Sequence, residues 1–150
     1  MKTRKSWREK METAREAKIV KIPPRMHAKY GKGTMLIPSM LDLDALIRKV
    51  PRGRLITYGQ IREELARAAG TDCTCPMVTG MFVRIVAEAA AEDAAGGRSR
   101  ITPYWRVLRD DGSLLEKIPG GPSAQAERLE SEGHKVERSG KARVQLPSAR

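Results

Sequence analysis

Three helix-boundary signals in the middle of the chain constrain its fold more than any other feature. Thr57 and Gln60 have the spacing of a capping box, in which the threonine hydroxyl accepts from the amide of Gln60 and the glutamine side chain accepts from the cap amide. A helix is therefore predicted to begin near Tyr58, and Gly70 is the residue type that commonly ends one. Pro76 then stands where a first helical residue can lack its amide hydrogen. Two helices joined by a short loop are typical of a helix-turn-helix.

Apolar residues at helical spacing support these two helices and predict another ahead of them. A repeat at i, i+3, i+4 and i+7 indicates one apolar face directed at a core. The pattern comprises Leu43, Leu46, Ile47 and Val50 before Pro51, then Ile61, Leu65 and Ala68, and finally Met77, Val78, Met81, Phe82, Ile85, Val86 and Ala89. The last of these helices should be long and end near Gly96-Gly97.

Turn signals follow the long helix. Arg109-Asp110-Asp111-Gly112 separates Arg106–Leu108 from Ser113–Leu115 and predicts a short hairpin or wing. Ser123 is expected to cap a last helix that runs to about Ser131. A chain of 150 residues that is 40% hydrophobic suits one modest core. We therefore expect a mainly α fold with a small β wing, in a single winged helix-turn-helix-like domain.

The excess positive charge of the chain lies at its two ends. Of a formal net charge of +11, residues 1–34 carry 11 Lys and Arg against 3 Glu, and residues 133–150 carry 5 against 1. Cationic flanks on a nearly neutral body suit the phosphates of double-stranded DNA, and a solvated tail kept for solubility is the alternative. We expect a basic N-terminal arm or extended strap at 1–38, a DNA-binding domain at 39–137 and a basic flexible tail at 138–150.

Other features bear on location and cofactors. No apolar run approaches the roughly 20 residues of a membrane span, and no signal-peptide core follows the basic N-terminus, so we expect a cytoplasmic protein with no membrane partner. Cys73 and Cys75 are too close in sequence for an easy disulfide, which fits a reducing compartment. With only His27 and His134 as histidines, the sequence predicts no metal site and no cofactor. We expect a monomer.

A hexapeptide beyond the long helix connects the chain to known chemistry. The segment Thr102-Pro103-Tyr104-Trp105-Arg106-Val107 is followed by Gly120-Gly121 and then by Glu132-Gly133-His134. In this order the residues resemble the Pro-Cys-His-Arg active-site stretch of the O6-alkylguanine-DNA alkyltransferase family and of its non-catalytic alkyltransferase-like relatives. The resemblance covers roughly residues 41–137. It implies a protein that binds duplex DNA and extrudes a nucleotide into a pocket.

The resemblance also implies which residues touch DNA. Tyr58 matches a tyrosine that presses on the phosphate of the target nucleotide, and Thr79 and Gly80 match small residues that let the helix enter the minor groove. Pro76 stands at an arginine that fills the gap left by the extruded base, and a proline ring can wedge there but cannot donate hydrogen bonds. The expected DNA-binding residues are Tyr58, Pro76, Met77, Thr79, Gly80 and Arg84.

The same resemblance implies that catalysis has been lost. Tyr104 stands at the acceptor cysteine and Trp105 at the catalytic histidine, while Glu132 matches the glutamate that orients the histidine. A phenol with a pKa near 10 is far less ionised at neutral pH than a thiol, and no adjacent base activates it. We therefore expect no enzymatic activity. The expected base pocket comprises Tyr104, Trp105, Arg106, Gly120, Gly121 and Glu132.

Several roles stay open from sequence alone. Tyr104 and Trp105 either line a pocket for an extruded base or fill the volume of a former pocket. In the first case Tyr104 faces the base, because neighbours in an extended segment point to opposite sides. Arg106 bonds either the backbone and Glu132 or the DNA. Tyr58 either contacts a phosphate or packs against the preceding segment.

Three functions correspond to these alternatives. The first is a sensor of O6-alkylguanine that flags the lesion for a repair-protein partner, as the resemblance to the alkyltransferase-like proteins implies. The second is a general DNA-binding or regulatory module with a filled pocket. The third and least favoured is an alkyl acceptor that uses Cys73 or Cys75, which lie in the loop between the two helices and away from the hexapeptide.

Overall fold

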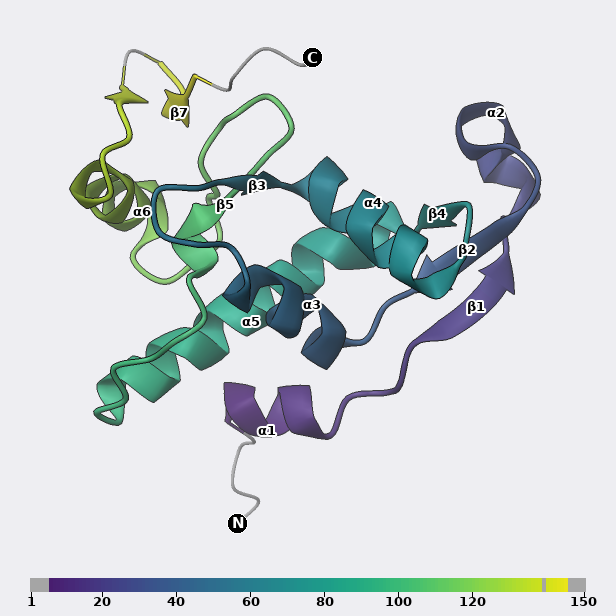
Figure 1. Cartoon of the computed structure of the whole chain (residues 1–150), viewed down its shortest axis with the longest axis horizontal. Helices are drawn as coiled ribbons and strands as arrows, with labels where there is room; N and C mark the ends of the chain where they lie inside the picture. Colours follow the sequence, from purple (N-terminus) through teal and green to yellow (C-terminus); the bar gives the residue numbers. More distant parts are fainter. Residues whose placement is uncertain (1–5, 139, 146–150) are drawn as a thin grey trace.

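The computed structural model describes residues 6–138 and 140–145, which are arranged around one long helix, α5 (Figure 1). Helix α5 spans Pro76–Ala95. The other helical elements are α1 (Trp7–Glu12), the 3₁₀ turn η1 (Pro24–Met26), α2 (His27–Tyr30), α3 (Met40–Arg48), α4 (Tyr58–Ala69), the 3₁₀ turn η2 (Tyr104–Arg106) and α6 (Gly121–Ser131). Helices α1, α3 and α4 and the turn η2 all contact α5. The main hydrophobic core forms where they meet, around fully buried residues of α5 such as Val83, Val86 and Ala90.

Three small sheets surround this helical centre. Strand β2 (Thr34–Ile37) pairs antiparallel with β1 (Lys18–Lys21) and parallel with β4 (Cys73–Thr74). Strand β3 (Ile56–Thr57) pairs parallel with β5 (Val107–Leu108), with Ile56 opposite Val107. Strand β6 (Val136–Glu137) pairs antiparallel with β7 (Arg143–Val144). The predicted fold class, mainly helical with small sheets, is confirmed.

The helix boundaries predicted from capping chemistry are also confirmed. The hydroxyl of Thr57 accepts from the Gln60 amide at 3.2 Å, and the side chain of Gln60 accepts from the Thr57 amide at 2.9 Å. Gly70 closes α4 in the left-handed conformation at φ 72°, and Pro76 is the first residue of α5. The helix-turn-helix is therefore set by contacts between residues close in sequence.

The predicted hairpin forms its turn but not its ladder. The amide of Arg109 donates to the carbonyl of Ser113 at 3.0 Å, and the amide of Gly112 donates to Arg109 at 2.9 Å. Beyond this turn the two segments separate, because Val107–Leu108 pairs with β3 and Ser113 bridges to Arg143. The sheet partners thus come from distant segments, which local turn signals do not reveal.

Two local predictions on either side of this turn are wrong. Helix α6 begins at Gly121 with Gly120 as its cap, so Ser123 lies inside its first turn instead of capping it. On α4 the inward residue after Leu65 is Ala66, whereas Ala68 is exposed. In both cases the start or phase of the helix differs from the predicted one by one or two residues.

The arm expected as an extended strap contains α1, β1 and β2 and packs into the fold. Met11 of α1 is fully buried in the main core, and Ile22 and Met35 form a smaller core cluster with Cys75. At the other end of the chain, Val144 of β7 is buried against the same main core. Residues 1–5 of the predicted arm, and 139 and 146–150 of the predicted tail, lie outside the described residues.

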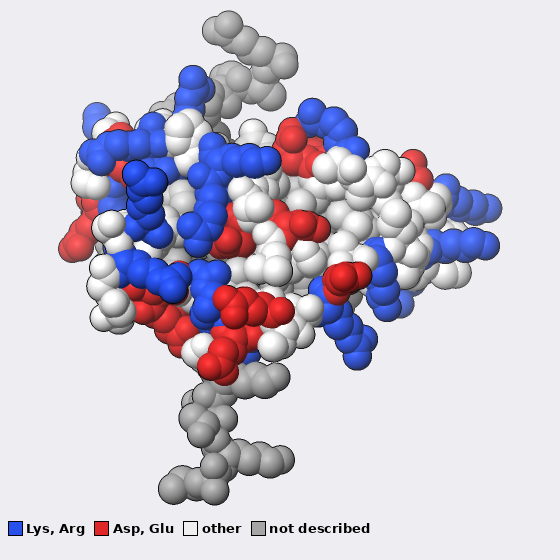
Figure 2. Space-filling view, turned by 60° about the horizontal axis from the view of Figure 1, so that its bottom comes forward, with Lys and Arg blue, Asp and Glu red and all other residues white. Residues whose placement is uncertain are grey.

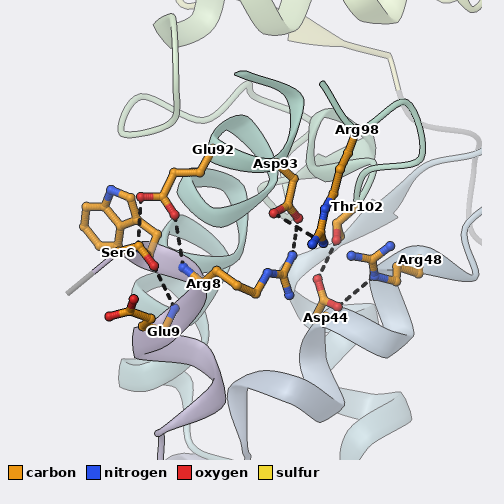
Figure 3. Close-up of polar contacts among 10 residues, drawn as sticks. Ser6, Arg8, Glu9, Asp44, Arg48, Glu92, Asp93, Arg98 and Thr102 are labelled. Atoms are coloured by element: carbon orange, nitrogen blue, oxygen red, sulfur yellow. Dashed lines mark hydrogen bonds and ion pairs between the residues drawn. The ribbon is translucent and has the colours of Figure 1, made fainter. Parts of the chain in front are cut away.

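Polar contacts attach α1 to the C-terminal half of α5 (Figure 3). The amides of Trp7 and Arg8 donate to the two carboxylate oxygens of Glu92, at 3.0 and 3.1 Å. These amides belong to the first turn of α1, where helical N–H groups have no partner within the helix. The guanidinium of Arg8 also pairs with the buried carboxylate of Asp93. The arm therefore satisfies the carboxylate oxygens of Glu92 by hydrogen bonds and neutralises the charge of Asp93.

Membrane-spanning helices and metal-binding clusters are both absent from the described residues. Within residues 6–138 and 140–145, no helix combines the length and apolar character that a bilayer crossing needs. The same residues contain no cluster of three or more His, Cys, Asp or Glu side chains that could hold a metal ion.

Met11→Ala should lower the free energy of unfolding by about 2–4 kcal/mol, because it leaves a cavity where the arm enters the core. Urea denaturation measures the change. Met77→Ala is the matched control, since Met77 is 72% exposed and its truncation should change stability by less than about 0.5 kcal/mol. Equal stability of the two variants would show that the arm is not part of the core.

Candidate nucleic-acid interface

A surface cavity of about 380 Å³ lies between the start of α4, the first half of α5 and the loop that precedes α6. Its lining comprises Tyr58, Gly80, Met81, Arg84, Arg109, Leu115, Glu116, Lys117 and Ile118. Three of the six predicted DNA-binding residues, Tyr58, Gly80 and Arg84, thus come together around one opening. Its volume is within the range of sites for small organic groups.

The outer face of α5 next to this cavity is apolar and unobstructed. Met77 and Met81 are 72% and 57% exposed and lie one turn apart. At Gly80 a side chain would meet no atom within 4 Å, so nothing in the protein blocks the close approach of another molecule there. Apolar side chains of this kind act as wedges between base steps in minor-groove proteins. Met81 was assigned to the core by its helical spacing, and no sequence signal separates it from the buried methionines.

The other two predicted DNA-binding residues of α5 are less accessible. Thr79 is fully buried, and its hydroxyl donates to the carbonyl of Cys75 at 3.0 Å. Its small side chain therefore faces the protein instead of the solvent. Pro76 begins the helix and is half-buried. The outward surface of this helix is formed by Met77, Gly80, Met81 and Arg84.

Tyr58 is held at the cavity by the first turn of α4. The carboxylate of Asp110 accepts from the Gly59 amide at 2.7 Å and pairs with Arg62 at 3.3 Å, so the turn at 109–112 is fixed to the start of this helix. Burial raises the pKa of Tyr58, against the lowering effect of Arg109 and Arg62. Its hydroxyl is therefore protonated at neutral pH and can donate a hydrogen bond to an anionic oxygen.

The hexapeptide does not have the extended conformation expected for it. Residues 104–106 form the 3₁₀ turn η2, and Tyr104 and Trp105 are only 6% and 7% exposed. The two rings meet edge to face, with 5.4 Å between centroids and an angle of 80°, and both belong to the main core. Tyr104 lies outside the lining of the cavity, and burial raises its pKa. This placement agrees with the alternative in which the rings fill the volume of a former pocket.

Glu132 fixes the orientation of Trp105 and Arg106. The indole Nε1 of Trp105 donates to Glu132 Oε2 at 2.9 Å, and Arg106 donates to both carboxylate oxygens at 2.9 and 2.8 Å. Arg106 also donates to the carbonyl of Val50 at 2.7 Å. Burial alone would raise the pKa of Glu132, but the hydrogen bonds from Arg106 and Trp105 outweigh it and hold that pKa below its ordinary value. Of the two alternatives for Arg106, the structure shows the contact with Glu132 and the backbone.

Helix α6 contacts the loop that precedes it, which lines the cavity. Gly120 and Gly121 both have left-handed backbone angles, and a side chain at Gly120 would lie 2.5 Å from the side chain of Ala124. The buried side chain of Gln125 accepts from the Leu115 amide at 2.7 Å and donates to the carbonyls of Trp105 and Val107. These contacts join the loop to the hexapeptide. The glycine pair therefore shapes the turn behind the cavity instead of lining it.

The two cysteines lie away from the cavity. Cys73 is on strand β4, where burial raises the pKa of its thiol with a further contribution from Asp72. Cys75 is buried at the start of α5. A raised pKa lowers the thiolate fraction at neutral pH, and the thiolate is the form that attacks carbon.

Both the sequence and the fold of this chain are similar to those of known proteins. Residues 43–134 match the family model described as 6-O-methylguanine DNA methyltransferase, DNA binding domain. The fold is similar to that of the alkyltransferase-like protein of S. pombe solved with DNA, with a TM-score of 0.50 and 21% identity, over 72% of this chain and 87% of that one. S. pombe Atl1 with damaged DNA containing O6-carboxymethylguanine matches over the same shares, at 21% identity and a TM-score of 0.47. No curated protein matches the sequence.

Glu132→Gln should lower the free energy of unfolding by about 3 kcal/mol near pH 7, because it removes the charge that pairs with the buried Arg106. The folded-state pKa of Glu132 is below its ordinary 4.5, so its contribution to stability is complete above pH 4.5 and is lost as the pH falls through the folded value. The difference between wild type and variant should therefore shrink in acid. Urea denaturation at several pH values measures it.

The matched control is Glu130→Gln, two residues earlier. Glu130 pairs with Arg138 on the surface, at 2.7 Å. An exposed pair contributes little, so this variant should unfold close to wild type at every pH. A Glu132→Gln variant as stable as the Glu130→Gln control would contradict the role of Glu132 as the anchor of η2.

Proposed function

This chain belongs to the 6-O-methylguanine DNA methyltransferase family, and we propose that it binds duplex DNA without transferring an alkyl group. The observation that carries the proposal is the cavity where Tyr58, Gly80 and Arg84 meet beside an apolar, unobstructed helix face. A duplex whose minor groove receives α5 is contacted by Met77 and Met81 between base steps and by Arg84 at the backbone. The hydroxyl of Tyr58 donates to a phosphate at the mouth of the cavity.

The basic flanks of the chain attract DNA in a way that does not depend on the base sequence of the DNA. We assign the DNA-binding unit to residues 39–137 and the additional positive charge to the arm at 1–38 and the tail at 138–150. Binding through such charges weakens as salt rises, because neutralised phosphates release counterions.

The chemistry of the hexapeptide supports the absence of alkyl transfer. Burial raises the pKa of Tyr104, which lowers the already small phenolate fraction at neutral pH. Trp105 offers only an N–H donor, and that donor is bonded to Glu132, so the residue accepts no proton. Cys73 and Cys75 lie outside the lining of the cavity. The hexapeptide thus has no activated nucleophile, and the residue next to Tyr104 is an indole that cannot act as a base.

The cavity beside Tyr58 is where an extruded O6-alkylguanine would enter. Extrusion is least costly for a damaged or mismatched base, which favours a lesion over a normal pair. The bound complex then marks the lesion for a repair protein. A second candidate function is a general DNA-binding module, and the burial of both Tyr104 and Trp105 favours it, because these rings belong to the main core and do not line the cavity.

A duplex with one central O6-methylguanine should bind more tightly than the unmodified duplex, by about five-fold or more, which corresponds to roughly 1 kcal/mol. Fluorescence anisotropy at fixed salt measures both affinities. Equal affinities would select the general module, and no binding to either duplex at low salt would refute DNA binding altogether. In the same incubation the mass of the protein should not increase by a methyl group, and an increase would identify the chain as an alkyl acceptor.

Tyr58→Phe should weaken binding to both duplexes by about five-fold, because it removes one hydrogen bond to a phosphate and leaves the ring in place. Tyr30→Phe is the matched control. Tyr30 ends α2, away from the cavity, so this variant should bind as wild type does. Unchanged affinity of Tyr58→Phe would show that the tyrosine only packs.

A further inference from the structure

A second cavity, of about 460 Å³, lies at the opposite end of α5 from the interface. Five arginines line it, namely Arg48, Arg98, Arg100, Arg106 and Arg128, and all ten lining residues lie in the described part of the chain and include no carboxylate. We call this cavity the arginine pocket. Lys and Arg side chains gather on the left of Figure 2, the side on which α6 and the C-terminal end of α5 lie in Figure 1.

Three of these arginines form ion pairs with buried carboxylates. Arg48 pairs with Asp44 at 2.8 Å and Arg98 with Asp93 at 3.7 Å (Figure 3), and Arg106 pairs with Glu132 at 2.8 Å. Both aspartates are buried, whereas Arg48 and Arg98 are exposed. A guanidinium has five N–H donors, so each arginine keeps donors that its carboxylate does not use. Hydrogen bonds therefore orient Arg48 and Arg106 before any ligand arrives, whereas the longer ion pair with Asp93 keeps the exposed Arg98 near the pocket.

The other two arginines have no acidic partner. Within residues 6–138 and 140–145, Arg100 and Arg128 form no ion pair that would neutralise them. The guanidinium of Arg128 instead stacks on the ring of Trp105, 4.2 Å from its centroid. Stacking fixes the position of the cation and leaves its donors free. Five positive charges thus share three carboxylates, and the pocket carries an excess of positive charge.

The arrangement of the arginines around the pocket favours one class of ligand. The planar fork of arginine matches the oxygens of a phosphate in a bidentate manner, and several such forks around one opening favour a phosphate over a single carboxylate. The pocket also presents the ring of Trp105 beside the cations. A strongly basic chain that already binds one polyanion meets phosphodiesters at high local concentration.

The arginine pocket is separate from the surface around Tyr58. Arg84 lines the first cavity and Ala94 the second, so ten residues of helix, or about 15 Å, lie between them. Glu88, Glu92 and Asp93 occupy this interval on α5. Glu88 and Glu92 are partly exposed and place negative charge between the two basic surfaces, whereas Asp93 is buried and paired with Arg8 and Arg98.

We propose that the arginine pocket is a second nucleic-acid site, which binds the phosphodiester backbone of a DNA segment other than the one held by α5. One molecule then holds two segments of DNA at once. The inference goes beyond the proposed function, because lesion recognition uses none of Arg48, Arg98, Arg100 or Arg128.

A bridging assay with the full chain tests this site. A duplex of about 20 base pairs without a lesion is fixed to beads and saturated with protein, and the capture of a second, fluorescent duplex is measured at low salt. Arg100→Gln/Arg128→Gln should reduce the captured fluorescence about five-fold or more, while the amount of protein on the fixed duplex stays within about two-fold of wild type. Thermal unfolding verifies that the variant folds.

The control removes the same charge elsewhere. Arg67→Gln/Arg143→Gln lowers the net charge equally, and both side chains are exposed and lie outside the arginine pocket. This variant should bridge as wild type does.

The proposal would be overturned if the pocket variant captured as much of the second duplex as wild type does. It would also be overturned if wild type saturated the fixed duplex and captured no second duplex. Release of the fluorescent duplex by an equimolar octaglutamate peptide would assign the pocket to an acidic protein segment and overturn it as well. The amount of protein retained on the fixed duplex measures binding through the surface around α5. A failure of DNA binding itself is therefore distinguished from a failure to capture the second duplex.

Discussion

The carboxylate of Glu132 is the group on which the arrangement of the hexapeptide depends. Its side chain is only 5% exposed and is bonded by Trp105 and by both ends of the Arg106 fork. A buried carboxylate of this kind is costly unless each of its oxygens is satisfied, so the three side chains hold one another in a single arrangement. That arrangement fixes the turn η2. It turns the indole toward the arginine pocket and leaves Tyr104 within the core, outside the lining of the cavity that Tyr58 borders.

Helix α5 differs chemically between its halves, and the rest of the chain is placed accordingly. Its first half is apolar and carries one cation, Arg84, beside Met77 and Met81, which the described residues leave exposed. Its second half contains Glu92 and Asp93, which would repel a polyanion if they were free. They instead accept the amides of α1 and pair with Arg8 and Arg98. The arm therefore does more than add charge, because it neutralises Asp93 and covers the carboxylate of Glu92 with hydrogen-bond donors.

How far the sequence predicted this molecule depends on the range of the interactions involved. The capping box at Thr57 and the start of α5 at Pro76 were predictable, because each is set by residues within a few positions of one another. The pairing of β3 with β5 and the turn at Tyr104 were not, since the first joins segments about fifty residues apart and the second is held by Glu132, 27 residues beyond Trp105. The resemblance brought Tyr58, Gly80 and Arg84 into one set, and the structure places them around one cavity. Met81 and the arginine pocket were missed, because helical spacing does not reveal which apolar residues stay exposed, and arginines scattered from 48 to 128 form no local pattern.

The indole at position 105 also limits what single substitutions could do at this turn. A cysteine in place of Tyr104 would have no proton acceptor at position 105, because the indole is bonded to Glu132 and cannot take up a proton. An imidazole in place of Trp105 would remove the platform on which Arg128 rests and leave a void in the core. Positions 104 and 105 are thus coupled, because neither substitution alone would place a thiol beside a base.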